Sequence, residues 1–259
     1  MKPKYLLEIS VETLEAAAAA ECAGADRIEL CANLNVGGVT PSAELMRATR
    51  ARVTIPIFAM IRPRPGNFVY SDAESVQIRR EIDAAKSCAI DGIVLGILRA
   101  DSTVDIQRTR ALVEFARPLP VTFHRAFDEI RDIHGALEDV IATGATRILT
   151  SGGSRSAPEG AAKLAELVSA ARGRIAILPG GGINPSNLAR IVRETRATEF
   201  HSGLGTSLPY GRSNHEEFAR EVRKLAEILR EMEAAREMEA ARESSESAPP
   251  AAIPSTSDS

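Results

Sequence analysis

One short stretch, Val121-Thr122-Phe123-His124-Arg125-Ala126-Phe127-Asp128, places a histidine, an arginine and an aspartate within five residues. An imidazole can carry a proton near neutral pH, a guanidinium can bind a carboxylate or a phosphate, and a carboxylate can orient either group. The residues before His124 are β-branched or aromatic and follow two prolines, which predicts a short buried strand that ends where the charges begin. Ligands of parallel α/β proteins bind at the carboxyl ends of strands. We therefore expect His124 and Asp128 to be catalytic and Arg125 to bind substrate.

Short apolar runs alternate with segments of helical period eight times along the chain, as in βα units around a parallel sheet. The expected strands are 5–9, 26–30, 55–61, 92–97, 120–124, 146–150, 175–179 and 198–202. The expected helices include 11–23, 73–88, 105–116, 130–142, 157–172, 184–195 and 214–230. This pattern predicts an α/β fold, a TIM-type (β/α)8 barrel formed as a single domain by residues 1–230. Residues 231–259 are expected to form a helical extension and a disordered tail, because they offer little to bury.

Three helix starts carry recognisable signals. Ser42 and Ser71 precede helical segments and are expected to cap them, and Pro185 after Asn184 is expected at a first helical position.

Alternation along each strand separates side chains that face the barrel interior from those that face the helices. Where the apolar residue of a pair must meet the helices, its polar neighbour falls inside. This rule places the following residues in the interior: Glu8, Ser10, Glu29, Cys31, Met60, Arg62, Thr122, His124, Glu199 and His201. Buried charges are costly unless paired, so their convergence predicts a ligand site or an ion-pair plug.

Several roles are open to these residues. Glu29 or His124 is expected to transfer protons, and Arg62 to bind an anionic group of a substrate or to pair with Glu29. Glu8 and His201 are candidate metal ligands, since carboxylates and imidazoles bind hard and borderline metals. A lysine does not occur at any expected strand end, which disfavours Schiff-base chemistry.

Glycine-rich segments follow the last two expected strands. Gly180, Gly181 and Gly182 come after the seventh, and Gly203 comes after the eighth. In barrels of this type the backbone amides of these two loops form the usual phosphate site, and Ser151 after the sixth strand would extend it. The alternative is that these glycines only turn the chain.

Composition limits the class of protein. The net charge of −3 comes without a basic cluster, so neither nucleic acid nor an anionic membrane is an expected partner. No run approaches the roughly 18 apolar residues of a membrane span, and an acid at position 8 argues against a signal peptide. Three cysteines outside any CxxC spacing argue against a disulfide framework. We expect a soluble cytoplasmic protein whose partner is a small molecule or a metal, with self-association into a homo-oligomer left open.

The chain resembles the CutC family of copper homeostasis proteins. The matching stretches are Ala25-Asp26-Arg27-Ile28-Glu29-Leu30-Cys31, Gly37-Gly38-Val39-Thr40-Pro41-Ser42, Met60-Ile61-Arg62-Pro63-Arg64, Phe68-Val69-Tyr70-Ser71, Val121 to Asp128, Arg147-Ile148-Leu149-Thr150-Ser151-Gly152, Pro179-Gly180-Gly181-Gly182 and Glu199-Phe200-His201. The resemblance implies a TIM-type barrel, a cytoplasmic location and an association with copper tolerance or copper binding.

Two positions depart from the family pattern. The family often has a cysteine at the place of Ser10, and that thiol together with the one matching Cys31 is the suggested copper pair. Loss of one thiol weakens a Cu(I) site, because Cu(I) prefers thiolate and thioether ligands, and leaves Cys31 with Met60. At Arg64-Pro65-Gly66-Asn67 the family usually has two glycines and an aspartate.

The sequence therefore leaves three functions open. The first is a copper-handling protein with copper at Cys31, Glu8 and His201. The second is a lyase or isomerase acting on a small anionic or phosphorylated metabolite at the carboxyl end of the barrel. A barrel enzyme that uses a divalent metal bound by Glu8, Glu29, His124 and His201 is a weaker third alternative.

Overall fold

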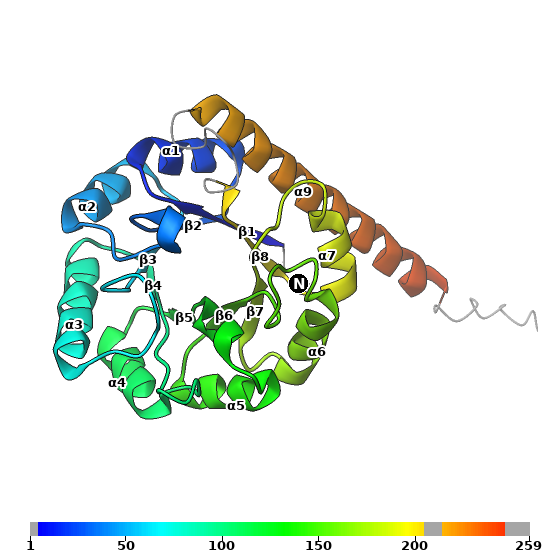
Figure 1. The fold of residues 1–259 in the computed structure, drawn as a ribbon. Helices are drawn as coiled ribbons and strands as arrows, with labels where there is room; N and C mark the ends of the chain where they lie inside the picture. Colours follow the sequence, from blue (N-terminus) through cyan, green and yellow to red (C-terminus); the bar gives the residue numbers. More distant parts are fainter. Residues whose placement is uncertain (1–4, 205–213, 247–259) are drawn as a thin grey trace, which may run out of the picture.

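A computed structural model describes residues 5–204 and 214–246 of the 259-residue chain. Strands and helices alternate along it (Figure 1). The strands are β1 (Leu6–Val11), β2 (Arg27–Leu30), β3 (Ile57–Met60), β4 (Gly92–Leu95), β5 (Val121–Phe123), β6 (Arg147–Thr150), β7 (Ala176–Pro179) and β8 (Glu199–Ser202). The helices are α1 (Leu14–Ala23), α2 (Ala43–Arg52), α3 (Asp72–Ser87), α4 (Ile106–Ala116), α5 (Ile133–Thr143), α6 (Ala161–Ala171), α7 (Leu188–Thr195) and α9 (His215–Glu246).

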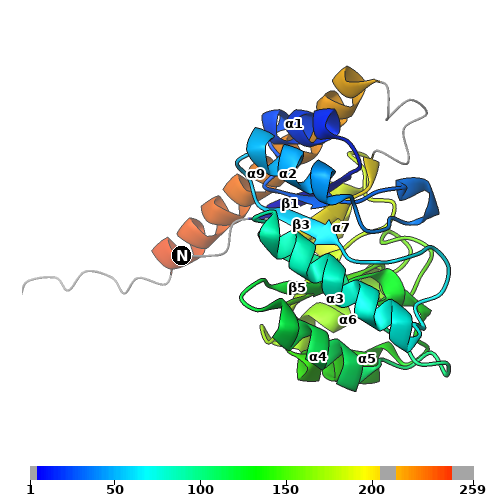
Figure 2. The same ribbon diagram turned by 90° about the vertical axis from the view of Figure 1, so that its left-hand side faces the viewer.

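The eight strands form one parallel sheet in the order β7-β6-β5-β4-β3-β2-β1-β8. The sheet curls until its edge strands β7 and β8 meet, and the helices surround it as an outer ring (Figures 1 and 2). The expected TIM-type barrel is confirmed, and each expected strand is present with ends shifted by only a few residues.

Helix starts follow the capping signals in two of three cases. The Ser42 side chain accepts a hydrogen bond from the Leu45 amide, and Ser71 forms a capping box with Glu74. The expectation for Asn184 is wrong, because α7 begins only at Leu188, with Asn187 as its N-cap residue. The Asn184 side chain accepts a hydrogen bond from the Ser186 amide, and its carbonyl accepts from the Asn187 and Leu188 amides, so a separate capped turn precedes the helix.

The strand alternation separates two kinds of core. Side chains that face the helices are aliphatic or aromatic and fully buried, for example Leu7, Ile9 and Phe200. Side chains on the opposite phase are ionisable but also buried, among them Glu8, Arg27 and Glu29. The outer layer therefore supplies most of the hydrophobic stabilisation, whereas the barrel interior must satisfy charges.

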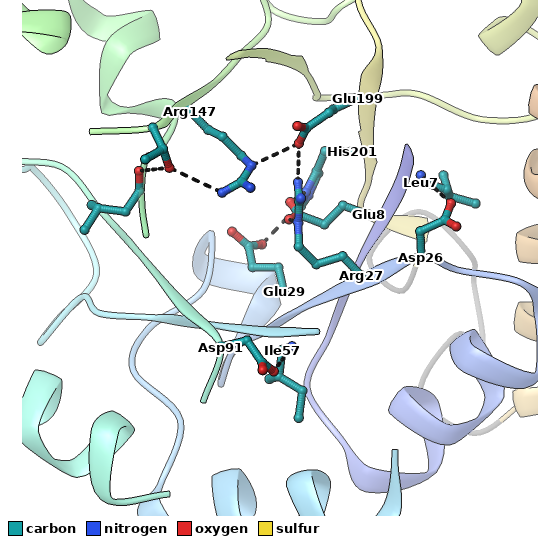
Figure 3. A network of polar contacts seen from close by, with 12 residues as sticks. Leu7, Glu8, Asp26, Arg27, Glu29, Ile57, Asp91, Arg147, Glu199 and His201 are labelled. Atoms are coloured by element: carbon teal, nitrogen blue, oxygen red, sulfur yellow. Dashed lines mark hydrogen bonds and ion pairs between the residues drawn. The ribbon is translucent and has the colours of Figure 1, made fainter. Parts of the chain in front are cut away.

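A chain of ion pairs crosses the barrel interior (Figure 3). The Arg147 guanidinium binds Glu199 at 3.0 Å, and Arg27 binds the same Glu199 oxygen at 2.7 Å. Arg27 also donates to Glu8, whose other oxygen lies 2.7 Å from Nδ1 of His201. Each charge in this chain has an opposite partner, which is the condition for burying it.

Phe58 fills the space beside the two arginines of this chain. The Arg27 and Arg147 guanidinium carbons lie 4.9 Å and 4.8 Å from the Phe58 ring centroid. A Cβ at Gly92 would approach the Phe58 ring to 2.5 Å, so only glycine leaves room for it. The ring thus covers the cation faces that carboxylates leave open.

Helix α9 runs from His215 to Glu246 and packs against α1 and α7, and its later turns extend past the barrel (Figure 1). The sequence predicts a helix over 214–230 followed by an extension, and the two form one continuous helix. Residues such as Ala, Glu, Arg and Met favour helix without tertiary support. The expected tail beyond residue 246 lies outside the described residues. In the described part of the chain, no helix has the length and apolar character to span a bilayer.

We predict that Glu8 makes the free energy of unfolding depend on pH in the acid range. Burial alone raises the pKa of Glu8, but the Arg27 charge and the His201 hydrogen bond outweigh it and lower the pKa from 4.5 to about 2. Because the folded pKa is the lower one, the stabilisation is present above pH 4.5 and is lost as the pH falls toward 2. The gap in unfolding free energy between wild type and Glu8→Gln should narrow by roughly 2 kcal/mol between about pH 5 and pH 3.

Urea denaturation at stepped pH measures this gap. Glu138→Gln is the matched control, since its exposed pair with Arg174 should contribute little at any pH. A gap for Glu8→Gln that stays constant across this range would contradict the assignment.

Candidate functional site

A cavity with a volume of about 380 Å³ opens at the carboxyl ends of the strands. Its wall contains several residues that the sequence singles out: Ser10, Glu29, Met60, Arg62, His124, Arg125, Gly181, Gly182, His201 and Gly203. The strand phase explains this, because alternate residues near each strand end face the interior. The structure brings these residues together, and their catalytic and binding roles stay predictions.

A hydrogen bond to Glu8 holds the His201 side chain in place (Figure 3). Glu8 remains ionised, so Nδ1 of His201 donates its proton to Glu8 Oε1 at 2.7 Å. This bond fixes the imidazole orientation and leaves Nε2 for other partners, as in carboxylate–histidine pairs of catalytic sites. Nε2 lies 3.8 Å from Glu29 Oε2. Glu8 is therefore a positioning residue beneath a His201–Glu29 pair.

Both members of the pair have raised pKa values. Burial lowers the pKa of His201, but the negative charge of Glu29 and the bond to Glu8 outweigh it and raise that pKa. Burial raises the pKa of Glu29, with a further contribution from the Glu8 charge, although His201 partly opposes both. The second carboxyl oxygen of Glu29, Oε1, is buried without a hydrogen-bond partner. A proton can thus reside on either member of the pair.

His124 has the opposite character. Burial and the nearby Arg62 charge lower its pKa to about 3, so the ring is neutral at physiological pH. Nδ1 accepts a hydrogen bond from the Ala126 amide at 3.2 Å, which puts the ring proton on Nε2. Nε2 is buried and has no partner. His124 therefore offers the cavity a neutral donor and is a poor base, which narrows the role predicted for it.

Arg62 is buried to 6% exposure and holds backbone oxygens. Its Nη1 donates to the carbonyls of Val36 and Gly38, and its Nη2 donates to Gly66, while Phe68 lies 4.8 Å from the guanidinium carbon. The alternative expected pairing with Glu29 is wrong, because Glu29 faces His201 instead. In the described ranges Arg62 forms no ion pair with a carboxylate. Its charge in the cavity wall therefore favours an anionic ligand.

Asp128 lies behind the cavity and fixes other groups. Its carboxylate accepts hydrogen bonds from the Thr150 hydroxyl, from the Ser151 amide and hydroxyl, and from the Gly153 amide. It also binds Nε of Arg125 at 2.8 Å. Among the described residues that line the cavity, Asp128 and Ser151 are absent. Their geometry supports positioning of Arg125 rather than contact with a substrate.

The three glycines after β7 lie in two different settings. The Gly180 amide donates to the Thr150 carbonyl, and a Cβ there would lie 2.4 Å from Leu149 and 3.2 Å from the His201 Cβ. Gly181 and Gly182 adopt positive φ angles of 93° and 76° and line the cavity. Gly203 lines it from β8, whereas Gly205 of the same loop lies outside the described residues.

Cys31 is fully buried beside the cavity. Its Sγ lies 3.6 Å from Glu29 Oε2, and burial together with the Glu29 charge raises the pKa of the thiol well above its ordinary value. Met60 packs in the same small cluster. Ser10 of β1 lies in the cavity wall and pairs in register with Glu29 of β2. A copper ion would find one protonated thiol and one thioether here, an incomplete soft donor set.

A harder metal has a different donor set. Glu8, Glu29 and His201 each offer an atom within 4.8 Å of the others. Two of these three donors are already engaged, since Glu8 binds Arg27 and His201. The set therefore fits a proton-transfer group better than a metal cage.

Sequence reasoning missed several residues that shape the site. Arg27 has the same inward phase as Glu29 two residues later, so the alternation could have placed it. Phe68 stacks against His124 with ring centroids 4.7 Å apart, but it comes from a loop without periodicity. Arg147 was also overlooked, although its strand alternates in the same way.

The fold and the cavity define a TIM-type barrel with ionisable side chains in a cavity at the carboxyl ends of its strands. The CutC family model matches residues 5–206, and the chain belongs to the CutC family. The human copper homeostasis protein cutC homolog is 47% identical over 197 residues, covering 76% of this chain and 72% of the human protein. A CutC family protein of Chromobacterium violaceum is 42% identical over 234 residues, covering 86% and 95%.

Solved structures agree with the fold. The crystal structure of CutC from Streptococcus agalactiae superposes with a TM-score of 0.72 at 35% identity, covering 76% of this chain and 98% of that one. Thiamine phosphate pyrophosphorylase from Pyrococcus furiosus, at 17% identity and a TM-score of 0.59, covering 88% and 96%, shares the barrel alone.

We predict that the two cavity histidines titrate on opposite sides of the ordinary value of 6.5. His124 should keep its proton on Nε2 alone down to about pH 4, because its cationic form is buried beside Arg62. His201 should remain cationic above 6.5, because Glu8 and Glu29 stabilise its charge. Long-range ¹H–¹⁵N correlation spectra follow both rings, with Glu8→Gln expected to lower the pKa of His201 only. Coincident titration of the two rings would refute this electrostatic description.

Proposed function

We propose that the protein is an enzyme of the isomerase or lyase type that moves protons on a small anionic metabolite in the barrel-mouth cavity. The observation that carries this proposal is the His201–Glu29 pair, which faces the same cavity as buried Arg62. Groups with perturbed pKa values that converge in a cavity are typical of catalytic sites.

Arg62 supplies the affinity for an anion. Its donors bind loop carbonyls, so the guanidinium is fixed in place while its positive charge remains unneutralised by a described carboxylate. A rigid charge costs little reorganisation when an anionic substrate enters. The neutral Nε2–H of His124 lies in the same wall and suits an oxygen on which negative charge develops.

A balanced proton exchange follows from the His201–Glu29 geometry. With His201 protonated and Glu29 ionised, Glu29 removes a proton from one substrate carbon and His201 delivers its Nε2 proton to another atom. The substrate is thereby isomerised, and the pair is left as neutral His201 and protonated Glu29. Closure of the 3.8 Å separation to hydrogen-bond distance lets Glu29 return that proton to Nε2 of His201, which restores the starting state. Glu8 stays ionised throughout and stabilises the imidazolium.

This proposal predicts catalysed deuterium uptake. Small hydroxy acids, keto acids and sugar phosphates incubated with the protein in D₂O should show exchange of a carbon-bound proton by ¹H NMR for at least one compound. Glu29→Gln and His201→Asn should each slow the exchange about 100-fold or more. Glu166→Gln and His134→Asn are matched controls from an exposed pair and should leave it unchanged. Compounds that bind yet never exchange would contradict the proposal.

Copper(I) binding is the second candidate function, and one specific observation favours it. A Cβ built on Gly38 would lie 3.1 Å from Cys31 Sγ and 3.6 Å from Met60 Cε, so two soft side chains meet beside the cavity. The human and mouse relatives are named copper homeostasis proteins, which also favours a copper-binding function. The raised pKa of Cys31 opposes it, since the thiolate is the form that binds Cu(I).

If the protein binds Cu(I), introducing a second thiol at the site should raise its Cu(I) affinity. Ser10→Cys should strengthen Cu(I) affinity in a competition titration, because residue 10 lines the cavity next to the β2 strand end. Cys31→Ala should abolish most of it, whereas Cys22→Ser, at an exposed thiol, is the control. Equal affinities for wild type, Ser10→Cys and Cys31→Ala would remove Cys31 as a copper ligand.

A further inference from the structure

We infer that Arg125 and the Gly181 to Ile183 backbone form a phosphate subsite, so that the substrate class is a phosphate monoester of a short carbon chain. This inference rests on the proposed function and specifies which anion the cavity takes.

Arg125 is held rigidly with one end free. Its Nε binds Asp128 at 2.8 Å and its Nη2 donates to the Ser151 hydroxyl at 3.0 Å. Asp128 is itself fixed by donors from the end of β6 and the loop after it, including the Thr150 hydroxyl and the Gly153 amide. Nη1 has no hydrogen bond within residues 5–204 and 214–246, and the side chain is 43% exposed. The free edge of the guanidinium can therefore receive an oxyanion without rearrangement.

Gly181 places backbone directly against this guanidinium. A Cβ at Gly181 would lie 3.1 Å from both Cζ and Nη1 of Arg125, and the residue has a φ of 93°. Both the left-handed conformation and the close approach require glycine. Arg125 and Gly181 thus present a charged donor and a backbone segment side by side in the cavity wall.

The peptide carbonyls of this segment are already engaged elsewhere. The Gly181 oxygen accepts from the Ala157 amide at 2.8 Å, and the Gly182 oxygen accepts from the Asn187 side chain at 2.9 Å. In a trans peptide the following N–H points opposite to the carbonyl. The amides of Gly182 and Ile183 are therefore directed away from these partners, and neither donates a hydrogen bond within the described ranges. Two unpaired amides beside a free guanidinium edge suit an oxyanion with several acceptor oxygens.

The position of this subsite constrains the rest of the ligand. Gly180, one residue earlier, packs against His201, and a Cβ there would lie 3.2 Å from the His201 Cβ. Arg125 directly follows His124, whose Nε2 lacks a partner. A phosphate held between Arg125 and Gly182 therefore leaves the carbon chain beside the His124 donor and the His201–Glu29 pair. A cavity of about 380 Å³ has room for such a compound.

Phosphate binding can be tested directly on the full chain. Inorganic phosphate and glycerol 3-phosphate should bind in calorimetry with dissociation constants on the order of millimolar or tighter. In ¹H–¹⁵N spectra the amides of Gly182 and Ile183 should move downfield on titration, while Gly173, which has no heavy atom near its Cβ position, should stay in place. No binding at ~20 mM ligand, or binding without movement of these amides, would overturn the inference.

Variants give a second readout. Arg125→Met should weaken phosphate binding about tenfold or more, and Arg131→Met, at an exposed arginine in the following loop, should leave it within about twofold. If Arg125→Met proves unstable, the amide shifts of the wild-type protein still decide. Equal affinity for a folded Arg125→Met would exclude the subsite.

The two proposals fail in distinguishable ways. Phosphate binding that persists in Glu29→Gln and His201→Asn, without deuterium exchange in wild type, keeps the subsite and refutes the proton-transfer function. Exchange of an unphosphorylated acid without any phosphate binding keeps the function and refutes the subsite.

Discussion

The Glu8 carboxylate between Arg27 and His201 is the interaction on which the interior of this barrel depends. Its two oxygens serve two partners, one arginine toward the centre of the barrel and one histidine at the mouth. Removal of Glu8 would leave a buried guanidinium short of one anion and His201 without its orienting bond. Stability and site geometry are therefore coupled through a single carboxylate, and the lowered pKa of Glu8 keeps that carboxylate ionised.

In the cavity next to Glu8, different surroundings give the two histidines different pKa values. His201 and His124 both line the mouth, but carboxylates raise the pKa of the first and a guanidinium with burial lowers that of the second. One ring can therefore carry a proton, while the other offers a fixed neutral donor. Separation of pKa values by environment is how a single cavity combines acid, base and hydrogen-bond donor.

Much of the fold could be predicted from the sequence, because period-two strands and helical segments alternate eight times. The inward phase of Glu29, His124 and His201 followed from the same alternation, and the structure places all three in one cavity wall. The start of α7 could not be predicted from Asn184-Pro185, because these residues form a separate capped turn that leads into the helix only at Leu188. The hydrogen-bond partners of Arg62 and Asp128 could not be predicted either. Arg62 donates to loop carbonyls and Asp128 accepts from the loop after β6, and both contacts join segments distant in sequence.

Binding of an anion in the cavity should be coupled to protonation of the His201–Glu29 pair. Calorimetry of glycerol 3-phosphate binding in buffers of different ionisation enthalpy measures that coupling as protons taken up per ligand. At about pH 8, where the phosphate ester is already a dianion, wild type should take up a fraction of a proton, and Glu29→Gln and His201→Asn should not. Binding without proton uptake, or the same uptake in both variants, would contradict this coupling.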